Sequence, residues 1–344
     1  NYFGFGGVLG NAASNDVVIS NCSNSGNINM SQELSAKGYT FLGGVVGRSQ
    51  ATILGCSNSG TVTFTGKNTA QPLYIGGIVG TMVNVSGDRI SEGTTNSGDI
   101  IINSSTQSDV DVFVGGIAGR SYNNIVATNS GEIKVEELSC TLLYLGGLVG
   151  ECNGTVSSGS KNLADGDITI AGLSVEDKTY LGGAVGLNSG NVTADNDGDV
   201  TLTETCSSVK SLFVGGVVGR GEAPVTSCTN TGAVTNGCSM ETSQSYLQLG
   251  GVVGYNNGDS PITDCHNTGD VTNTGNSTGF LYVGGVTSEC DADMENSTNT
   301  GAISNSGESG GTYSSGKKCH DTSVGGVSGV NNSITFSSCY NTGT

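Results

Sequence analysis

The sequence contains no tryptophan, two histidines, four methionines and three prolines among its 344 residues. It also has only 12 basic residues against 30 acidic ones, a formal net charge of −18. A chain this acidic is repelled by nucleic acid and by anionic membrane surfaces, so we expect neither as a partner. No apolar run approaches the length that spans a bilayer, so we expect no membrane insertion.

Residues for catalysis or for zinc binding are scarce as well. The only histidines are His266 and His320, the basic residues are scattered, and no carboxylate pair stands out from the repeated acidic positions. There is no CxxC motif of the kind that binds zinc. We therefore predict that the protein is not an enzyme, and a polysaccharide-degrading β-helix is the weaker alternative.

The chain lacks an initiator methionine and a signal peptide, so we interpret Asn1 as a processed end or as a cut through a longer protein. Its eleven cysteines are an odd number, which excludes complete internal pairing.

Glycine is abundant, with 58 residues, and much of it lies in a repeated GGΦΦG motif, where Φ is apolar. Ten copies, two of them degenerate, begin at residues 6, 43, 76, 115, 146, 182, 215, 250, 284 and 325. Successive copies are 31 to 41 residues apart, which indicates a repeat protein. No lysine or helix follows the motif, which argues against a phosphate-binding loop.

Each repeat has an aromatic–aliphatic pair, GGΦΦG, a polar turn, a short apolar segment, N-[S/T]-G and an alternating segment such as 61–64. Valine, isoleucine and threonine favour strands, and asparagine and glycine favour turns. We predict an all-β, parallel, right-handed β-solenoid of about ten rungs with three short strands per rung, GGΦΦG being one of them. It forms a single repeat domain, 1–344, with rungs beginning near 4, 41, 74, 113, 144, 180, 213, 248, 282 and 323.

Two positions directly before each GG pair carry the same kind of side chain in most repeats. We call such a set of equivalent positions along the rod a column. The residue directly before the GG pair is always apolar, as at Leu42, so this column should point inward. The residue two before it is often aromatic and should face outward or into a loop-covered groove. This aromatic ladder either stiffens the sheet or offers a platform for sugar rings or a neighbouring rod, and it consists of Phe41, Tyr74, Phe113, Tyr144, Tyr180, Phe213 and Tyr282.

The linked GGΦΦG and N-[S/T]-G motifs resemble the glycine-rich GLUG-type repeats of bacterial surface proteins, and the resemblance covers essentially the full chain. It implies a β-solenoid in a large extracellular, adhesin-like protein. The copies at 284 and 325 depart from the motif, ending in 286–288 as VTS and in 327–329 as VSG.

Five cysteines share one column, two residues before the asparagine of N-[S/T]-G: Cys22, Cys56, Cys228, Cys265 and Cys339. We interpret them as free thiols packed inside, since side chains in register are poorly aimed for a disulfide. Outside this column the plausible disulfides are Cys206–Cys238, Cys290–Cys319 and Cys140–Cys152, given an oxidising extracellular setting.

Acidic residues follow the N-x-G glycine in four successive rungs: Asp99, Glu132, Asp167 and Asp199. Stacked carboxylates repel one another. They either fan into solvent as turn residues or form a ladder that binds Ca²⁺, which would be the only cofactor. In another column, Arg120 and Glu151 stand on adjacent rungs and could pair across them, which would contribute to the register at most.

Possible N-glycosylation sites with the N-x-[S/T] pattern are Asn21, Asn29, Asn84, Asn103, Asn153, Asn191, Asn276, Asn296 and Asn331. They matter only if the source organism glycosylates asparagine.

Together these features predict an extracellular or cell-surface structural rod, a subunit or segment of a filament or stalk. No polar cap is visible at either end, so the rod would stack head to tail with copies of itself. The alternative is an adhesin that binds glycan or a host surface through the aromatic ladder and the variable loops.

Overall fold

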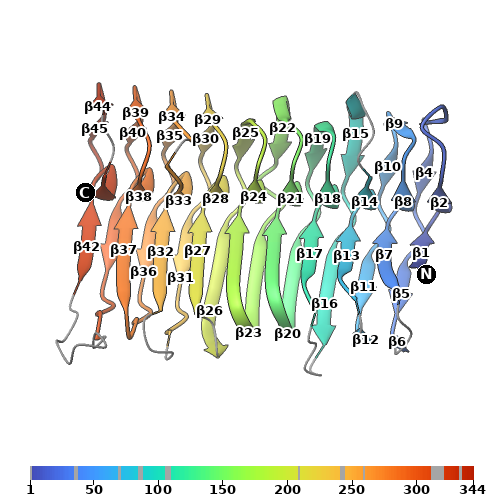
Figure 1. The fold of residues 1–344 in the computed structure, drawn as a ribbon, viewed down its shortest axis with the longest axis horizontal. Coiled ribbons are helices and arrows are strands. Elements are labelled where there is room, and N and C mark those ends of the chain that lie inside the picture. Colours follow the sequence, from blue (N-terminus) through green and yellow to red (C-terminus); the bar gives the residue numbers. More distant parts are fainter. Residues whose placement is uncertain are drawn as a thin grey trace.

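The protein is a long stack of parallel β-strands, shown as a computed structural model in Figure 1. The structure describes residues 2–34, 38–68, 71–83, 88–104, 110–207, 210–240, 245–258, 260–310, 321–332 and 335–344. The first strand lies at one end of the rod and the last at the other (Figure 1). The predicted all-β parallel solenoid is confirmed.

Sheet B contains ten parallel strands in sequence order, one from each repeat. Each begins three residues after the first glycine of a GGΦΦG copy, and Val79, for example, pairs with Val46 and Ala118. The strands are β2 (Leu9–Ala12), β8 (Val46–Ser49), β14 (Val79–Met82), β18 (Ala118–Ser121), β21 (Val149–Cys152), β24 (Val185–Asn188), β28 (Val218–Gly221), β33 (Val253–Asn256), β38 (Thr287–Cys290) and β43 (Ser328–Asn331).

Sheet C has sixteen strands and follows sheet B in every rung. It begins with β3 (Val18–Ser20), β4 (Ser23–Asn24), β9 (Thr52–Leu54), β10 (Ser57–Asn58), β15 (Asp88–Asn96), β19 (Asn124–Asn129), β22 (Val156–Asn162) and β25 (Val192–Asn196). It continues with β29 (Val225–Thr226), β30 (Thr229–Asn230), β34 (Ile262–Thr263), β35 (His266–Asn267), β39 (Met294–Glu295), β40 (Thr298–Asn299), β44 (Phe336–Ser337) and β45 (Tyr340–Asn341).

Sheet A joins the strands that end at the first glycine of GGΦΦG with the strands that follow the asparagine turn. Its first members are β1 (Tyr2–Gly6), β5 (Ile28–Met30), β7 (Tyr39–Gly43), β11 (Val62–Phe64), β13 (Leu73–Gly76), β16 (Ile100–Ser104), β17 (Val112–Gly115), β20 (Ile133–Gly146) and β23 (Ile168–Gly182). The others are β26 (Val200–Ser207), β27 (Ser211–Gly215), β31 (Val234–Asn236), β32 (Tyr246–Gly250), β36 (Val271–Asn273), β37 (Phe280–Gly284), β41 (Ile303–Asn305) and β42 (Thr322–Gly325). A two-stranded sheet pairs β6 (Glu33–Leu34) with β12 (Lys67–Asn68).

The GGΦΦG motif is a sharp bend, which we call the elbow, and the prediction that it forms one strand is wrong. Gly43 ends β7, and Val46 begins β8. Val45 and Val46 are adjacent yet both fully buried in one hydrophobic cluster, which a straight strand does not allow. The elbow splits one predicted strand into two, so the described residues of the rung 73–104 form four strands, β13 to β16, where three were predicted.

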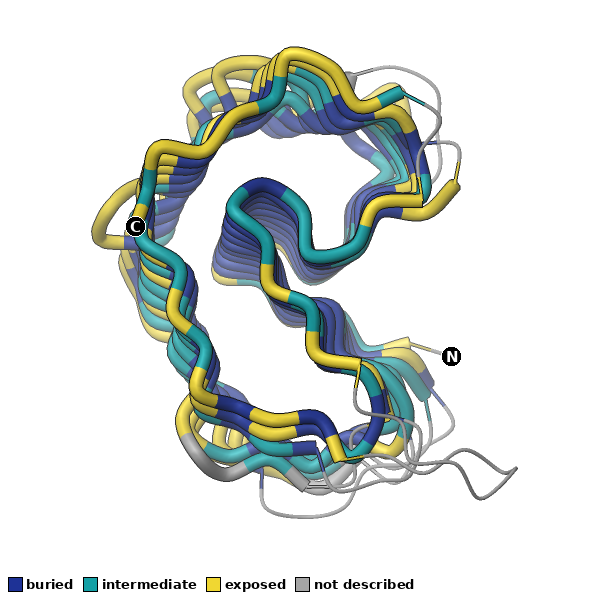
Figure 2. Tube along the Cα trace, turned by 90° about the vertical axis from the view of Figure 1, so that its left-hand side faces the viewer, coloured by how far each residue is buried: buried dark blue, intermediate teal, exposed yellow. Residues whose placement is uncertain are grey.

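Figure 2 shows the rod along its axis, with the elbows folded into the middle of each rung. They divide the apolar interior into two clusters. One cluster lies between sheets B and C and contains Val45, Val149 and Val218. The other lies within sheet A and contains Leu42, Leu145 and Val234. Stacking of rungs buries both clusters, since no single rung covers its own apolar side chains.

The inward column before each GG pair is confirmed. From Leu42 to Val283 these side chains are fully buried. The exceptions belong to the two end rungs, where Phe5 is 40% and Val324 is 49% exposed. In β20 and β23 the segments before GG are continuous strand, because these segments pair with each other over many residues.

Among the described residues, no helix is long and apolar enough to cross a membrane.

Candidate functional site

The aromatic ladder lies against sheet B. Phe41, Tyr74, Phe113, Tyr180 and Phe213 are only 4–6% exposed, and Tyr144 and Tyr282 are half-buried. Ring centroids of neighbouring members from Phe41 to Phe213 are 4.5–5.6 Å apart. This spacing is that of stacked aromatic pairs.

Side chains that stand five residues after the first glycine, on sheet B, cover the rings. The Arg120 guanidinium lies 5.4 Å from the ring centroid of Phe113. Leu187 packs on Tyr180 and Phe213. Burial raises the pKa of Tyr74 to about 12, so its ring stays uncharged at neutral pH. We call the ladder and this covering column together the elbow cluster.

The elbow cluster corrects the expectation that the ladder faces outward or into a loop-covered groove. The elbow turns the chain back so sharply that the outer face of sheet A meets that of sheet B. The ring faces are therefore occupied by other rings and by arginine, as at Phe113. Little ring surface remains for a sugar to stack on.

The expected pair between Arg120 and Glu151 lies within the elbow cluster. Glu151 Oε2 is 2.7 Å from Arg120 Nε, and Nη2 donates to Oε1 at 3.1 Å. Glu151 is 8% exposed, and burial raises the pKa of its carboxyl although Arg120 opposes this shift. The pair links β18 to β21, so it joins adjacent rungs.

A ladder of asparagine side chains, which was not predicted from the sequence, runs through all ten rungs. Each Nδ2 donates to Oδ1 of the next asparagine along the rod at 2.7–2.9 Å. Each Nδ2 also donates to a glycine carbonyl of its own turn, as in Asn58 to Gly60. The members are Asn24, Asn58, Asn96, Asn129, Asn162, Asn196, Asn230, Asn267, Asn299 and Asn341. A sequence signal existed: an asparagine shortly before a glycine recurs at this turn in every repeat, as N-[S/T]-G in eight of the ten.

The asparagine ladder explains the second glycine of each GG pair. A Cβ on Gly147 would lie 2.5 Å from Asn162 Cγ and 2.1 Å from the Gly183 carbonyl oxygen. A Cβ on Gly216 would lie 2.3 Å from Asn230 Cγ. Only glycine therefore lets the elbow approach the amide column of its own rung.

The proposed calcium ladder does not form. Asp99 Oδ1 accepts the backbone N–H of Glu132 at 3.0 Å, and Asp167 Oδ1 accepts that of Asp199 at 2.7 Å. These side chains are exposed or half-exposed and join successive turns. Within the described ranges, no group of three or more histidine, cysteine, aspartate or glutamate side chains is placed to hold a metal ion.

A disulfide joins Cys206 to Cys238, the pair that the sequence analysis put forward. The Cys140–Cys152 pair is wrong. Both thiols are free and buried, Cys140 in the cluster of sheet A and Cys152 in the cluster of sheets B and C, on opposite sides of the elbow. For the third pair, Cys290 is a free buried thiol and Cys319 lies outside the described residues.

The five column cysteines are free thiols that lie in or against the cluster of sheets B and C. Burial raises the pKa of the Cys56 thiol, and that of Cys152 to about 12. The Cys56 and Cys152 thiols are therefore protonated at neutral pH, and a protonated thiol is a poor nucleophile.

Of the sequon asparagines, Asn84 lies outside the described residues. Asn153 is half-buried, and Asn21, Asn29, Asn103, Asn191, Asn276, Asn296 and Asn331 are exposed. Glycosylation of these residues stays a prediction.

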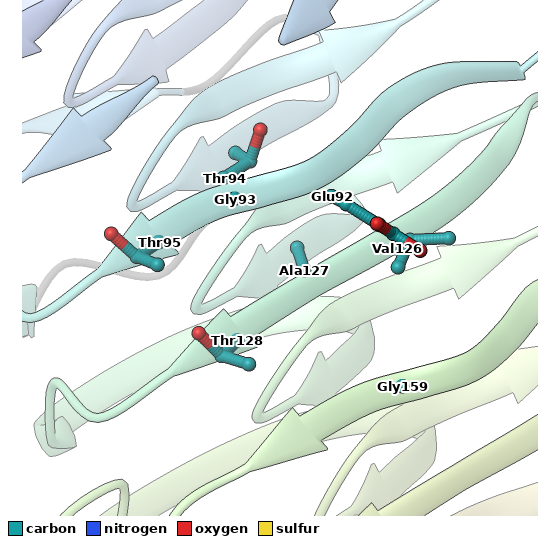
Figure 3. Close-up of a pocket in the computed structure, with 8 residues that line it drawn as sticks. All are labelled: Glu92, Gly93, Thr94, Thr95, Val126, Ala127, Thr128 and Gly159. Atoms are coloured by element: carbon teal, nitrogen blue, oxygen red, sulfur yellow. The ribbon is translucent and has the colours of Figure 1, made fainter. Parts of the chain in front are cut away.

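A shallow pocket lies where β15, β19 and β22 bulge (Figure 3). Gly93 and Gly159 adopt positive φ there, at 79° and 89°. Its lining contains one titratable group, and the lining residues are Glu92, Gly93, Thr94, Thr95, Val126, Ala127, Thr128 and Gly159. His266 lies elsewhere, in β35, with Nδ1 2.8 Å from Thr298 Oγ1, and His320 lies outside the described residues.

A family model described as the GLUG motif matches residues 245–272. This segment contains the elbow at 250 and the asparagine turn at 267, the two features that recur along the rod. No curated protein and no solved structure matches the chain.

Proposed function

We propose that this GLUG-motif β-solenoid is a structural rod of the cell surface or extracellular space, a subunit or segment of a filament or stalk. Further rungs stack on its end faces, and the partner is a second copy of the chain. The observation that carries the proposal is the direction of the asparagine ladder.

Every amide in the ladder donates toward the C-terminal end of the rod. Asn341, the last ladder member among the described residues, donates from Nδ2 to Gly343, and Asn24, the first, accepts the N–H of Gly26 at Oδ1. One end face thus presents the amide donor, and the other the amide acceptor, of the hydrogen bond that repeats along the rod. A second copy in register would join Asn341 of one chain to Asn24 of the next.

Apolar exposure at both ends supports the same contact. Val18 is 57% exposed at one end and Tyr340 is 59% exposed at the other. Phe5 and Val324 stand in the inward column, which is fully buried in the rungs between. Covering these side chains with another rung removes apolar area from water and pairs two open strand edges.

The extracellular location in this proposal is supported by the Cys206–Cys238 disulfide, since disulfides persist in oxidising compartments. The proposal includes no catalysis. It also excludes glycan binding through the ring faces, because the ladder is covered by sheet B.

The test is electron microscopy and light scattering of the purified protein across a concentration series. We expect rods that lengthen in steps of one copy. Val324→Lys and Phe5→Lys place a charge in the end columns and should stop growth. Leu163→Lys changes a residue that is 36% exposed on an inner rung and serves as the matched control.

Monomers at every concentration would overturn the proposal. So would filaments that persist in Val324→Lys, or filaments that Leu163→Lys abolishes equally.

A further inference from the structure

Two glutamates occupy the same position in different rungs, five residues after the first glycine of the motif. Glu151 in β21 faces the Arg120 guanidinium. Glu289 in β38 has Tyr255 and Val330 as its register neighbours, and neither carries a positive charge. Glu151 thus has a cation beside it, whereas the described residues that contact Glu289 include none.

A second carboxylate lies beside Glu289. The Asn332 amide nitrogen donates both to Glu289 Oε1 at 3.2 Å and to Asp291 Oδ1 at 2.8 Å, so the two acids converge on one atom. Asp291 Oδ2 accepts the Tyr255 hydroxyl at 2.8 Å. We call Glu289 and Asp291 the acid pair.

Among the described residues, the other contacts of the acid pair are neutral. Arg220 lies over the Tyr255 ring, yet its guanidinium pairs with Glu222 at 3.0 Å. Burial and the charge of Asp291 raise the pKa of the Glu289 carboxyl. Two carboxylates held this close without a cation repel each other.

An independent feature points to a ligand at this place. Gln248 interrupts the aromatic ladder, is 1% exposed, and donates from Nε2 to Glu289 Oε2. Its Oε1 is buried and has no hydrogen-bond partner among the residues that the structure describes. Since Oε1 and Nε2 share one carbon, that unpaired oxygen stands beside the Glu289 carboxylate. An unpaired buried polar atom is costly and is rare in folded proteins.

We propose that Glu289, Asp291 and Gln248 Oε1 form a binding site for Ca²⁺. A half-turn of the Gln248 amide puts Oε1 where Nε2 now lies, and a cation between the oxygens makes that arrangement favourable. The same half-turn at Asn332 offers its Oδ1. Calcium accepts six to eight oxygen ligands in flexible geometry, with water filling the remaining positions.

The experiment titrates the whole protein with Ca²⁺ by calorimetry, and with Tb³⁺ by luminescence. The chain has no tryptophan, so tyrosine sensitises bound Tb³⁺, and Tyr255 is adjacent to the site. We expect one saturable site from which Ca²⁺ displaces Tb³⁺. Glu289→Gln and Asp291→Asn should weaken the affinity by at least about tenfold, and Gln248→Leu should weaken it less.

Glu295→Gln removes one exposed acidic charge from the next strand of the same rung and is the matched control. It should leave the affinity unchanged. Circular dichroism checks that each variant folds. Tyr255→Phe should lower the sensitised emission more than it lowers the affinity for Ca²⁺.

Two results would overturn the proposal. One is the absence of saturable Ca²⁺ binding by the unaltered protein, a result that does not depend on any variant. The other is equal affinity in Glu289→Gln and Glu295→Gln, which would mean diffuse attraction of cations to a chain with net charge −18.

Discussion

The asparagine ladder and the aromatic ladder differ in how far each runs along the rod. The asparagine ladder passes through all ten rungs without a break. The aromatic ladder stacks from Phe41 to Phe213 and is interrupted at Gln248. Both place one side chain per rung at one position, so stacking geometry alone does not explain the difference.

The difference lies in what each side chain satisfies. An asparagine amide bonds the next rung and its own turn, so its loss leaves buried polar groups unpaired. An aromatic ring contributes apolar area and stacking, which another apolar side chain largely replaces. A polar ladder therefore has to be complete, whereas an apolar ladder tolerates substitution.

The largest effect should come from closing the space that the asparagine ladder needs. In Gly147→Ala, the new Cβ meets backbone oxygen at 2.1 Å as well as Asn162. We expect a loss of at least about 4 kcal/mol in the free energy of unfolding, measured in urea. Gly258→Ala is the control, because no atom lies within 4 Å of a Cβ there. Equal losses in both variants would contradict the steric explanation.

The second largest effect should come from removing one amide from the middle of the asparagine ladder. Asn162 donates to Gly166 and Asn196 and accepts from Asn129. Asn162→Ala should cost about 3 kcal/mol of unfolding free energy, since partners on both sides lose a bond in a buried place. Chemical denaturation measures it, with the exposed Asn191→Ala as the control. A cost below that of the ring substitution described next would reverse the ranking of the two ladders.

A ring substitution should cost less. Phe113→Leu keeps an apolar side chain and loses stacking on Tyr74 and Tyr144. We expect about 1 kcal/mol. Phe336, which is 43% exposed, provides the control substitution Phe336→Leu.

The smallest effect should come from alkaline pH. It acts on the tyrosines of the aromatic ladder and not on the asparagine ladder, because asparagine has no titratable group. The folded pKa of Tyr74 is raised to about 12 by burial, above the usual value near 10. The stability from its protonated hydroxyl is present below pH about 10 and is lost as pH rises through about 12.

Tyr74→Phe should therefore reduce the fall in unfolding free energy over that pH range, as urea denaturation at each pH would show. Tyr340→Phe, at a residue 59% exposed, should leave the fall unchanged. An unchanged pH profile in Tyr74→Phe would count against burial of the hydroxyl.

Much of the fold could be predicted because rung stacking repeats a side chain at fixed spacing. The inward column at Leu145, the packed thiol at Cys228 and the pairing of Arg120 with Glu151 all follow from which residues share a column. Column position gives neighbours along the rod. Column position does not show which residues are neighbours across a rung. The predicted disulfide between Cys140 and Cys152 was wrong for this reason.

The sequence by itself determined the period, the parallel stacking and the apolar columns, since these depend only on the spacing of residues along the chain. The tertiary structure decided that GGΦΦG bends instead of running straight. That bend places Phe113 under Arg120, Gly147 against Asn162, and Gln248 beside Glu289. The physical reason is that contacts across a rung depend on the angle of the elbow, and no periodicity in the sequence encodes that angle.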